Sequence, residues 1–123
     1  MIFVFGSNLA GIHGAGAAKE ALRHYGAICG NGRGAQGNSY AIPTKDEVMH
    51  TLSLKVVEAY IWAFLCHARA HPQQDFQVTR VGCGLAGFHD AEVAPLFASA
   101  PDNCLFDTAW LKYLPEKRSW GTF

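Results

Sequence analysis

The chain lacks the features that would assign it at once to a broad class of proteins. Its ten basic and ten acidic residues cancel, so no excess charge attracts duplex DNA or an anionic membrane. No apolar run approaches the roughly 20 residues of a membrane-spanning helix, and neither internal repeats nor linkers are visible. We therefore expect no membrane and no duplex DNA among its partners. Any bound anion must be held locally, by backbone N–H groups or by single cations.

Cysteine patterns that indicate a metal or a disulfide framework are also missing. The four cysteines are Cys29, Cys66, Cys83 and Cys104. They form no C-x-x-C pair and have no spacing typical of zinc ligands. Met1 leads directly into an apolar segment, without the basic region or cleavage site of a signal peptide. These absences favour reduced thiols in a cytoplasmic protein that uses neither a metal nor a cofactor.

The overall composition of the chain is that of one globular domain. The chain has 123 residues, of which 50% are hydrophobic and only 16% charged. A chain of this length buries enough apolar surface to fold without disulfides or metals. We expect a single domain over residues 1–123.

Short apolar runs alternate with segments of helical periodicity along the chain. Strands are expected at 2–5, 39–42, 76–81 and 103–106, and helices at 15–25, 54–71 and 90–100. Asp90 is a candidate cap for the last helix, although Pro95 also permits a fresh start there. The glycine-rich segment 30–37 predicts a turn-rich connection, and the tail after residue 107 is expected to pack back on the domain. This alternation predicts a three-layer α/β/α fold around a mostly parallel or mixed sheet.

The first of two glycine-rich loops spans residues 6–16 and ends where a helix is expected to begin. A helix N-terminus offers free N–H groups and a positive dipole end to an anion. Gly14 and Gly16 lack the Cβ atoms that would hold a phosphate away. The loop is not a P-loop, because Ala17 stands where the lysine belongs. The alternative is that these glycines only form a tight turn.

The second loop, residues 82–88, matches the pattern G-x-G-x-x-G directly after a predicted strand. It allows a dinucleotide-binding fold, in which Asp107 would be the acidic residue that contacts a ribose. Only 16 residues follow Asp107, however, and the helix after the loop contains Pro95. Because both loops follow strands, both are expected at the carboxyl edge of the sheet, where ligands bind in such folds.

Three segments resemble a known family, the macrodomains. Ser7–Asn8 with the run Gly14–Ala18 resembles the first loop of macrodomains. Arg80–Leu85 is similar to the phosphate-binding loop of the branch that includes terminal ADP-ribose glycohydrolases, and Tyr40–Lys45 resembles the lysine-bearing strand end of that branch. The segments occur in the family's order within residues 2–98. The chain therefore resembles a short, divergent macrodomain.

The resemblance implies that the chain binds ADP-ribose or an ADP-ribosylated substrate. Asn8 and Phe88 would lie near the distal ribose, and Lys45 would match the lysine that attacks the anomeric carbon. The ligand-binding residues that it implies are Ser7, Asn8, Gly14, Ala15, Gly16, Gly82, Cys83, Gly84, Leu85, Ala86, Gly87 and Phe88.

The sequence departs from the family at two places. The strand that ends in an adenine-binding aspartate has no counterpart, since the chain starts at what corresponds to the next strand. Ala86 also occupies the place of the catalytic aspartate of the glycohydrolase branch. The remaining candidates for catalysis are Lys45, Asn8, His13 and Asp90.

Each candidate also has an ordinary structural interpretation. Lys45 could be a solvated surface lysine, and Asn8 could bond only its own loop. His13 could be a bland exposed histidine, and Cys83 an inert buried spacer rather than a reactive thiol. Three hypotheses therefore stay open: an ADP-ribosyl hydrolase, a non-catalytic ADP-ribose or nucleotide sensor, and an interaction protein that keeps only the scaffold. The oligomeric state, the modified partner and the linkage also stay open.

Overall fold

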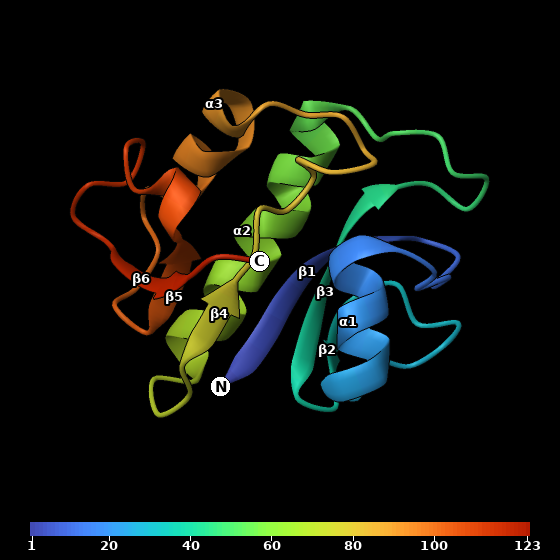
Figure 1. The fold of residues 1–123 in the computed structure, drawn as a ribbon, viewed down its shortest axis with the longest axis horizontal. Coiled ribbons are helices and arrows are strands. Elements are labelled where there is room, and N and C mark those ends of the chain that lie inside the picture. Colours follow the sequence, from blue (N-terminus) through green and yellow to red (C-terminus); the bar gives the residue numbers. More distant parts are fainter.

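A mixed sheet of six strands forms the middle layer of the protein (Figure 1). The computed structural model describes all residues 1–123. In chain order the strands are β1 (Ile2–Asn8), β2 (Gly34–Gln36), β3 (Ser39–Lys45), β4 (Phe76–Val78), β5 (Cys104–Asp107) and β6 (Arg118–Gly121). Their order across the sheet is β2-β3-β1-β4-β5-β6, and every pairing is parallel except that of β2 with β3. The first strand of the chain thus lies inside the sheet, between β3 and β4.

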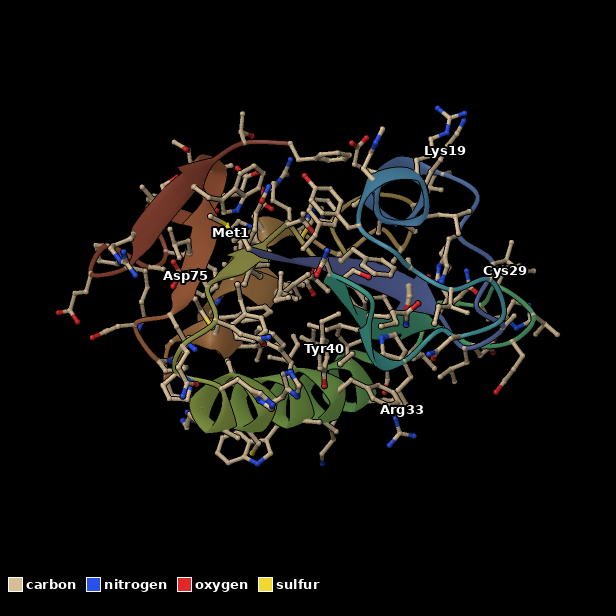
Figure 2. The ribbon with its side chains drawn as sticks, turned by 90° about the horizontal axis from the view of Figure 1, so that it is seen from below. Met1, Lys19, Cys29, Arg33, Tyr40 and Asp75 are labelled. Carbon is tan, nitrogen blue, oxygen red and sulfur yellow. The ribbon has the colours of Figure 1, made fainter.

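Helical segments cover both faces of this sheet. They are α1 (Gly16–His24), α2 (Leu54–Ala70), α3 (Asp90–Val93), and the 3₁₀ turns η1 (Ala94–Phe97) and η2 (Thr108–Trp110). Figure 2 shows the sheet nearly edge-on, with α1 on one side and α2 on the other. The alternation of β1 explains the two layers, because Phe3 and Phe5 pack in the small core of α1 while Val4 belongs to the larger core of α2. The predicted three-layer α/β/α fold class is confirmed.

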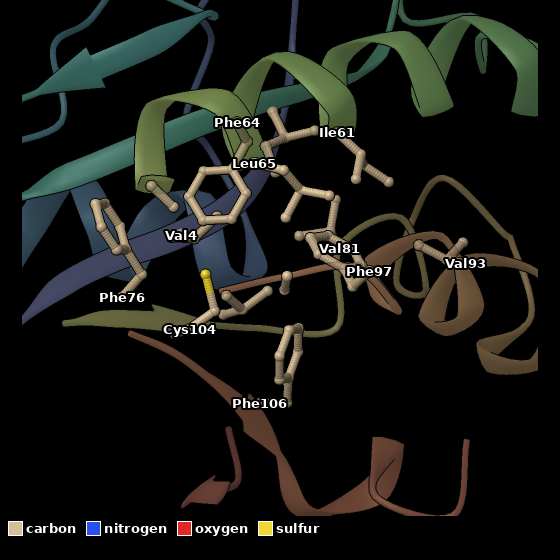
Figure 3. Close-up of a cluster of buried hydrophobic side chains, with 14 of the residues drawn as sticks. Val4, Ile61, Phe64, Leu65, Phe76, Val81, Val93, Phe97, Cys104 and Phe106 are labelled. Carbon is tan, nitrogen blue, oxygen red and sulfur yellow. The ribbon is translucent and has the colours of Figure 1, made fainter. Parts of the chain in front are cut away.

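The larger core lies between α2, η1 and the sheet (Figure 3). Phe64 of α2 is fully buried at its centre and packs against the rings of Tyr40, Phe76 and Phe97. The helix begins where the sequence predicts, because the Ser53 hydroxyl accepts a hydrogen bond of 3.3 Å from the Val56 N–H. This core fixes α2 against the strands whose ends form the site described below.

Two strands and several boundaries differ from the sequence prediction. The glycine-rich segment 30–37 contains edge strand β2, and the tail adds edge strand β6. β4 ends at Val78, and the chain turns directly after it, since the Val81 N–H donates back to the Thr79 carbonyl oxygen at 2.7 Å. The predicted helix 90–100 is two short pieces, and the second begins at Ala94, so Pro95 lies in its first turn but is not its first residue.

The cap of α3 is also different from the one expected. His89 is the N-cap residue, and its N–H donates a hydrogen bond of 2.9 Å to the Glu92 carboxylate. Asp90 is instead the first residue of the helix, which leaves its carboxylate free to bind elsewhere.

None of the helices has the length and apolar character that crossing a membrane requires.

Removal of the Phe64 ring tests the importance of the larger core. Phe64→Ala should lower the free energy of unfolding by about 3–5 kcal/mol, because it deletes a fully buried ring and leaves a cavity. Urea denaturation followed by circular dichroism measures this loss. Leu85→Ala, at an exposed residue, is the control and should change stability by less than about 0.5 kcal/mol. Equal effects of the two substitutions would contradict the central place of Phe64.

Candidate functional site

A cavity of about 450 Å³ opens at the carboxyl ends of β1, β3, β4 and β5. We call it the edge cavity. Both glycine-rich loops reach it, since parallel strands bring the loops that follow them to the same edge of the sheet. Its lining includes, among the residues expected from the sequence, Ser7, Asn8, Gly14, Ala15, Gly16, Lys45, Gly82, Gly84, Leu85 and Ala86.

The first loop is held in shape by its own polar groups. The Asn8 side chain binds the backbone of Ile12 twice: Oδ1 accepts from the N–H at 3.0 Å, and Nδ2 donates to the carbonyl at 2.8 Å. The Ser7 hydroxyl donates to the Gly32 carbonyl oxygen. A Cβ atom at Gly32 would collide with the Asn8 carbonyl, so the loop lies backbone to backbone against residues 30–32. Asn8 therefore shapes the loop as well as lining the cavity.

The first loop leads into a helix end with unpartnered donors. The N-cap of α1 is Ala15, which offers no side-chain cap, and the first turn contains no acidic residue. The N–H groups of Gly14–Ala18 donate to no acceptor in the chain. All five of these residues line the edge cavity. This end of α1 thus combines free N–H groups with the positive end of the helix dipole, the arrangement that binds anions.

The second loop adds another row of unpartnered donors. Its shape is fixed by three backbone hydrogen bonds of 2.9–3.1 Å: Gly87 and Phe88 donate to carbonyls of the same loop, and Cys83 donates to the Arg80 carbonyl just before it. The N–H groups of Gly82 and of the consecutive residues 84–86 have no acceptor in the chain. These four residues line the edge cavity. Successive free N–H groups of this kind attract phosphate and other anions.

At two positions of the lining, the fold does not require the residue to be glycine. Gly16, Gly82 and Gly87 have positive φ angles of 57°, 78° and 86°, which favour glycine for conformational reasons. Gly14 and Gly84 do not have positive φ angles. A Cβ at Gly84 would meet nothing within 4 Å, and one at Gly14 only the Ile12 side chain at 3.9 Å. The free space beside Gly14 and Gly84 therefore lies open to a bound molecule.

The charged side chains of the lining differ in whether they are already paired. Lys45, the last residue of β3, forms no ion pair. Arg80 binds the Asp90 carboxylate through two hydrogen bonds, of 2.9 and 2.7 Å. The Asp107 carboxylate is buried and accepts hydrogen bonds from the Ala109 and Phe123 N–H groups and from the Thr122 hydroxyl. Lys45 is thus the lining cation that is free to neutralise a bound anion.

His13 and Asp90 do not line the edge cavity. His13 is buried, its ring packs edge-on against Phe5, and its Nε2 lies 3.0 Å from the carbonyl oxygens of both Ile28 and Asn31. The Asp90 carboxylate accepts hydrogen bonds from Arg80 and, at 2.7 Å, from the indole N–H of Trp110. Chiefly because of the bond to Arg80, the pKa of Asp90 falls to about 2. Both side chains therefore hold the loops rather than face the cavity.

Three residues of the second loop also lie outside the lining: Cys83, Gly87 and Phe88. Burial raises the pKa of the Cys83 thiol to about 12, so the thiol stays protonated at neutral pH, as expected of an inert spacer. The Phe88 ring packs against the larger core and under Gly82, where an added Cβ would lie 3.0 Å from it. Phe88 therefore supports the loop from below.

The structure adds lining residues that the sequence did not indicate. Ile12, Met49 and Phe123 are exposed apolar side chains at the cavity, and Leu85 joins them. Met49 has a φ angle of 69°, the one positive value at a residue other than glycine. Asp46 shapes this turn, because its Oδ1 accepts from the N–H groups of Val48 and His50. Among these features, only Asp46, a residue type common in turns, gave a sequence signal for this part of the cavity.

Comparison of the chain with protein-family models, with curated proteins and with solved structures found no significant match. The site is therefore interpreted from its own geometry. Two rows of free N–H groups and one unpaired lysine surround a cavity with apolar side chains. Such a site suits a molecule that carries phosphate groups beside an apolar or aromatic part.

The ion pair between Arg80 and Asp90 predicts a loss of stability in acid. The folded pKa of Asp90, about 2, lies below the value of about 4 expected for an unfolded chain. The carboxylate therefore stabilises the fold above pH 4, and this contribution disappears as the pH falls from about 4 to about 2. Urea denaturation at several pH values should show a smaller loss for Asp90→Asn than for wild type. Asp102→Asn, at an exposed residue, should follow wild type, and identical profiles for all three proteins would contradict the coupling.

Proposed function

We propose that the edge cavity binds ADP-ribose or a related ligand in which a ribose is joined to phosphate. The observation that supports this most directly is the pair Gly14 and Gly84. They line the cavity from opposite loops, and neither crowding nor a positive φ angle requires glycine there. Glycine at such a position lets a ligand approach the backbone, and here it lies beside free N–H groups.

The two rows of N–H groups suit two phosphates of one ligand. One row is the first turn of α1, and the other is the stretch 84–86 of the second loop. Lys45 adds a formal positive charge that no carboxylate neutralises. The cavity volume of about 450 Å³ falls within the range of small-molecule sites. A diphosphate held between the loops would make charge-assisted hydrogen bonds to both.

The apolar lining suits the remainder of such a ligand. Ile12, Met49, Leu85 and Phe123 present exposed apolar surface around the cavity. Exposed apolar side chains gathered at a cavity favour contact with sugar and base faces. The proposed ligand would therefore be gripped at its phosphates by backbone and covered elsewhere by these side chains.

The dinucleotide-fold alternative receives less support from the geometry. That fold needs a helix whose N-terminus faces the pyrophosphate directly after the glycine loop. Here α3 has four residues, and the Glu92 carboxylate already binds the His89 N–H at its start, at 2.9 Å. The helix N-terminus with free donors follows the first loop instead.

Hydrolysis of an ADP-ribosyl linkage is a second candidate function, and the unpaired amine of Lys45 favours it. An amine at the cavity is placed to act as a nucleophile at an anomeric carbon. A general acid for the leaving group is harder to assign, since Asp107 is fully engaged in hydrogen bonds and Asp90 lies outside the lining. The geometry therefore supports binding more strongly than turnover.

ADP-ribose should raise the thermal unfolding midpoint of the protein. At a concentration 100 times its Kd, a ligand that binds only the folded state adds about 2.7 kcal/mol of stability, which corresponds to a shift of a few degrees. Gly84→Glu should remove the shift, because its side chain fills the ligand space and repels phosphate. Calorimetric titration measures the affinities of both proteins.

The Gly84 substitution separates binding from folding. Because a Cβ at Gly84 meets no other atom within 4 Å, Gly84→Glu should keep the wild-type circular dichroism spectrum. Gly84→Ala is the matched control without charge, and it should bind more weakly than wild type but more tightly than Gly84→Glu. Wild-type affinity in a folded Gly84→Glu protein would exclude the proposed placement of the phosphates.

Any turnover should depend on the Lys45 amine. Lys45→Ala should abolish release of ADP-ribose from an ADP-ribosylated substrate while changing ligand affinity by less than about tenfold. Lys45→Arg keeps the positive charge but lacks the nucleophilic amine, so it should bind normally and also fail to turn over. Product analysis by chromatography measures release. Undiminished release by either variant would assign the chemistry to another group, and no release by wild type would identify a binding protein.

A further inference from the structure

The outward side of α2 is largely apolar, although no other part of the chain covers it, and it also bears the exposed charged residues Lys55, Glu58 and Arg69. Its inward residues, such as Val57, Ile61 and Phe64, are buried in the larger core. Its outward residues include Val56, Ala59, Trp62, Ala63, Cys66 and Ala70, all exposed. We call these six residues the outer stripe. Figure 2 shows α2 as the outermost layer on its side of the sheet.

The composition of the outer stripe is unusual for a helix facing water. A surface helix is normally apolar on the core side and polar on the other, whereas only three of the nine exposed residues of α2 are charged or polar. Trp62 lies at one edge of the stripe with 61% of its surface exposed. Its neighbours on the helix surface are the charged residues Lys55, Glu58 and Arg69 and, toward the stripe, the small residues Ala59 and Cys66, which let a second helix approach closely. The stripe therefore has the character of a contact surface without its partner.

We propose that the outer stripe is the interface of a homodimer, in which two α2 helices pack antiparallel about a twofold axis near Ala63. A twofold interface is self-complementary, so each edge of the stripe must meet the same edge of the partner, running in the opposite direction. The charged residues at one edge of the stripe and the apolar residues at its other edge both meet this requirement.

Glu58 and Arg69 flank one edge of the stripe. At 100° per residue they lie within one fifth of a turn of Trp62, on its same side, and they are equally distant in sequence from the midpoint between Ala63 and Phe64. Antiparallel packing about that midpoint brings Glu58 opposite the partner's Arg69, and Arg69 opposite the partner's Glu58. Parallel packing would instead set like charges against each other.

Arg69 is already positioned for this contact. Its Nη2 donates to the Ser99 carbonyl oxygen at 2.7 Å, and its guanidinium carbon lies 5.9 Å from the centre of the Trp62 ring. Glu58 has no hydrogen bond or ion pair within the chain. The pair therefore offers one held cation and one unpaired carboxylate, which a second copy would bring together.

The opposite edge of the stripe is uncharged, and it obeys the same symmetry. Val56 and Ala70 are equally distant in sequence from Ala63, so each would meet the other across the axis. Trp62 would pack against Cys66 of the partner, which lies nearly opposite it in this register. One register thus brings together the aromatic residue with a small residue and the two pairs of opposite charges. The helix of 17 residues is about 25 Å long, so the contact would extend over at most that length.

Sedimentation velocity from low to high micromolar protein tests the interface. Wild type should convert from monomer to dimer over this range. Trp62→Glu should remain monomeric, with a dimer Kd raised at least tenfold, because it sets two carboxylates in an apolar contact. Leu22→Glu makes the same charge change at an exposed apolar residue of α1, and it should dimerise as wild type does. Circular dichroism confirms that each variant folds.

Charge reversal tests the orientation of the two helices. Glu58→Arg should weaken dimerisation, because it faces the partner's Arg69. The double variant Glu58→Arg/Arg69→Glu should restore it in an antiparallel pair. A monomeric wild type at every concentration would overturn the proposal and leave the stripe to a different protein. A dimer that survives Trp62→Glu would overturn the proposed interface. Failure of the double variant to regain dimerisation would overturn the antiparallel orientation.

Discussion

Strand β1 is held by parallel partners at both sides and by apolar layers at both faces, and the edge cavity takes its position from this strand. Its pairing with β3 and β4 aligns the ends of three strands. The first loop follows β1 directly, Lys45 ends β3, and the second loop follows β4 after the Thr79 turn. A shift of β1 by one residue would exchange the sides of Phe3 and Val4 between the two cores, so the alternation of buried side chains fixes the register of the site as well.

The glycines of the chain serve two different purposes. Gly11 and Gly32 permit backbones to touch, because a Cβ at either would overlap main-chain atoms of a neighbouring segment. Gly14 and Gly84 touch nothing in that way. The first kind packs the first loop against residues 30–32, and the second kind leaves the interior of the edge cavity open. A count of glycines in a loop cannot separate the two kinds, but the distance from an added Cβ at each glycine to the surrounding atoms can.

The sequence predicted the layers and the two loops, because periodicity and turn residues are local properties of a chain. The helical periodicity of residues 54–71 identified a real helix, and both loops lie at one edge of the sheet, as parallel strands require. Strands β2 and β6 were not predicted, since three or four residues at a sheet edge show no clear alternation. The positions of His13 and Asp90 depend on partners 10 to 20 residues away, among them Asn31 and Trp110, and so could not be inferred from spacing.

The central position of β1 also bears on how the chain reaches its folded state. Val4 pairs with Tyr40 on one side and with Val78 on the other, so the partners of the first strand are synthesised much later than the strand itself. Pairings between segments so far apart in sequence slow folding, since long loops must close before the contacts form. The run Ile2–Phe5, apolar on both faces, therefore emerges from the ribosome without a sheet to join. During synthesis this segment is the one with the greatest need of protection from aggregation.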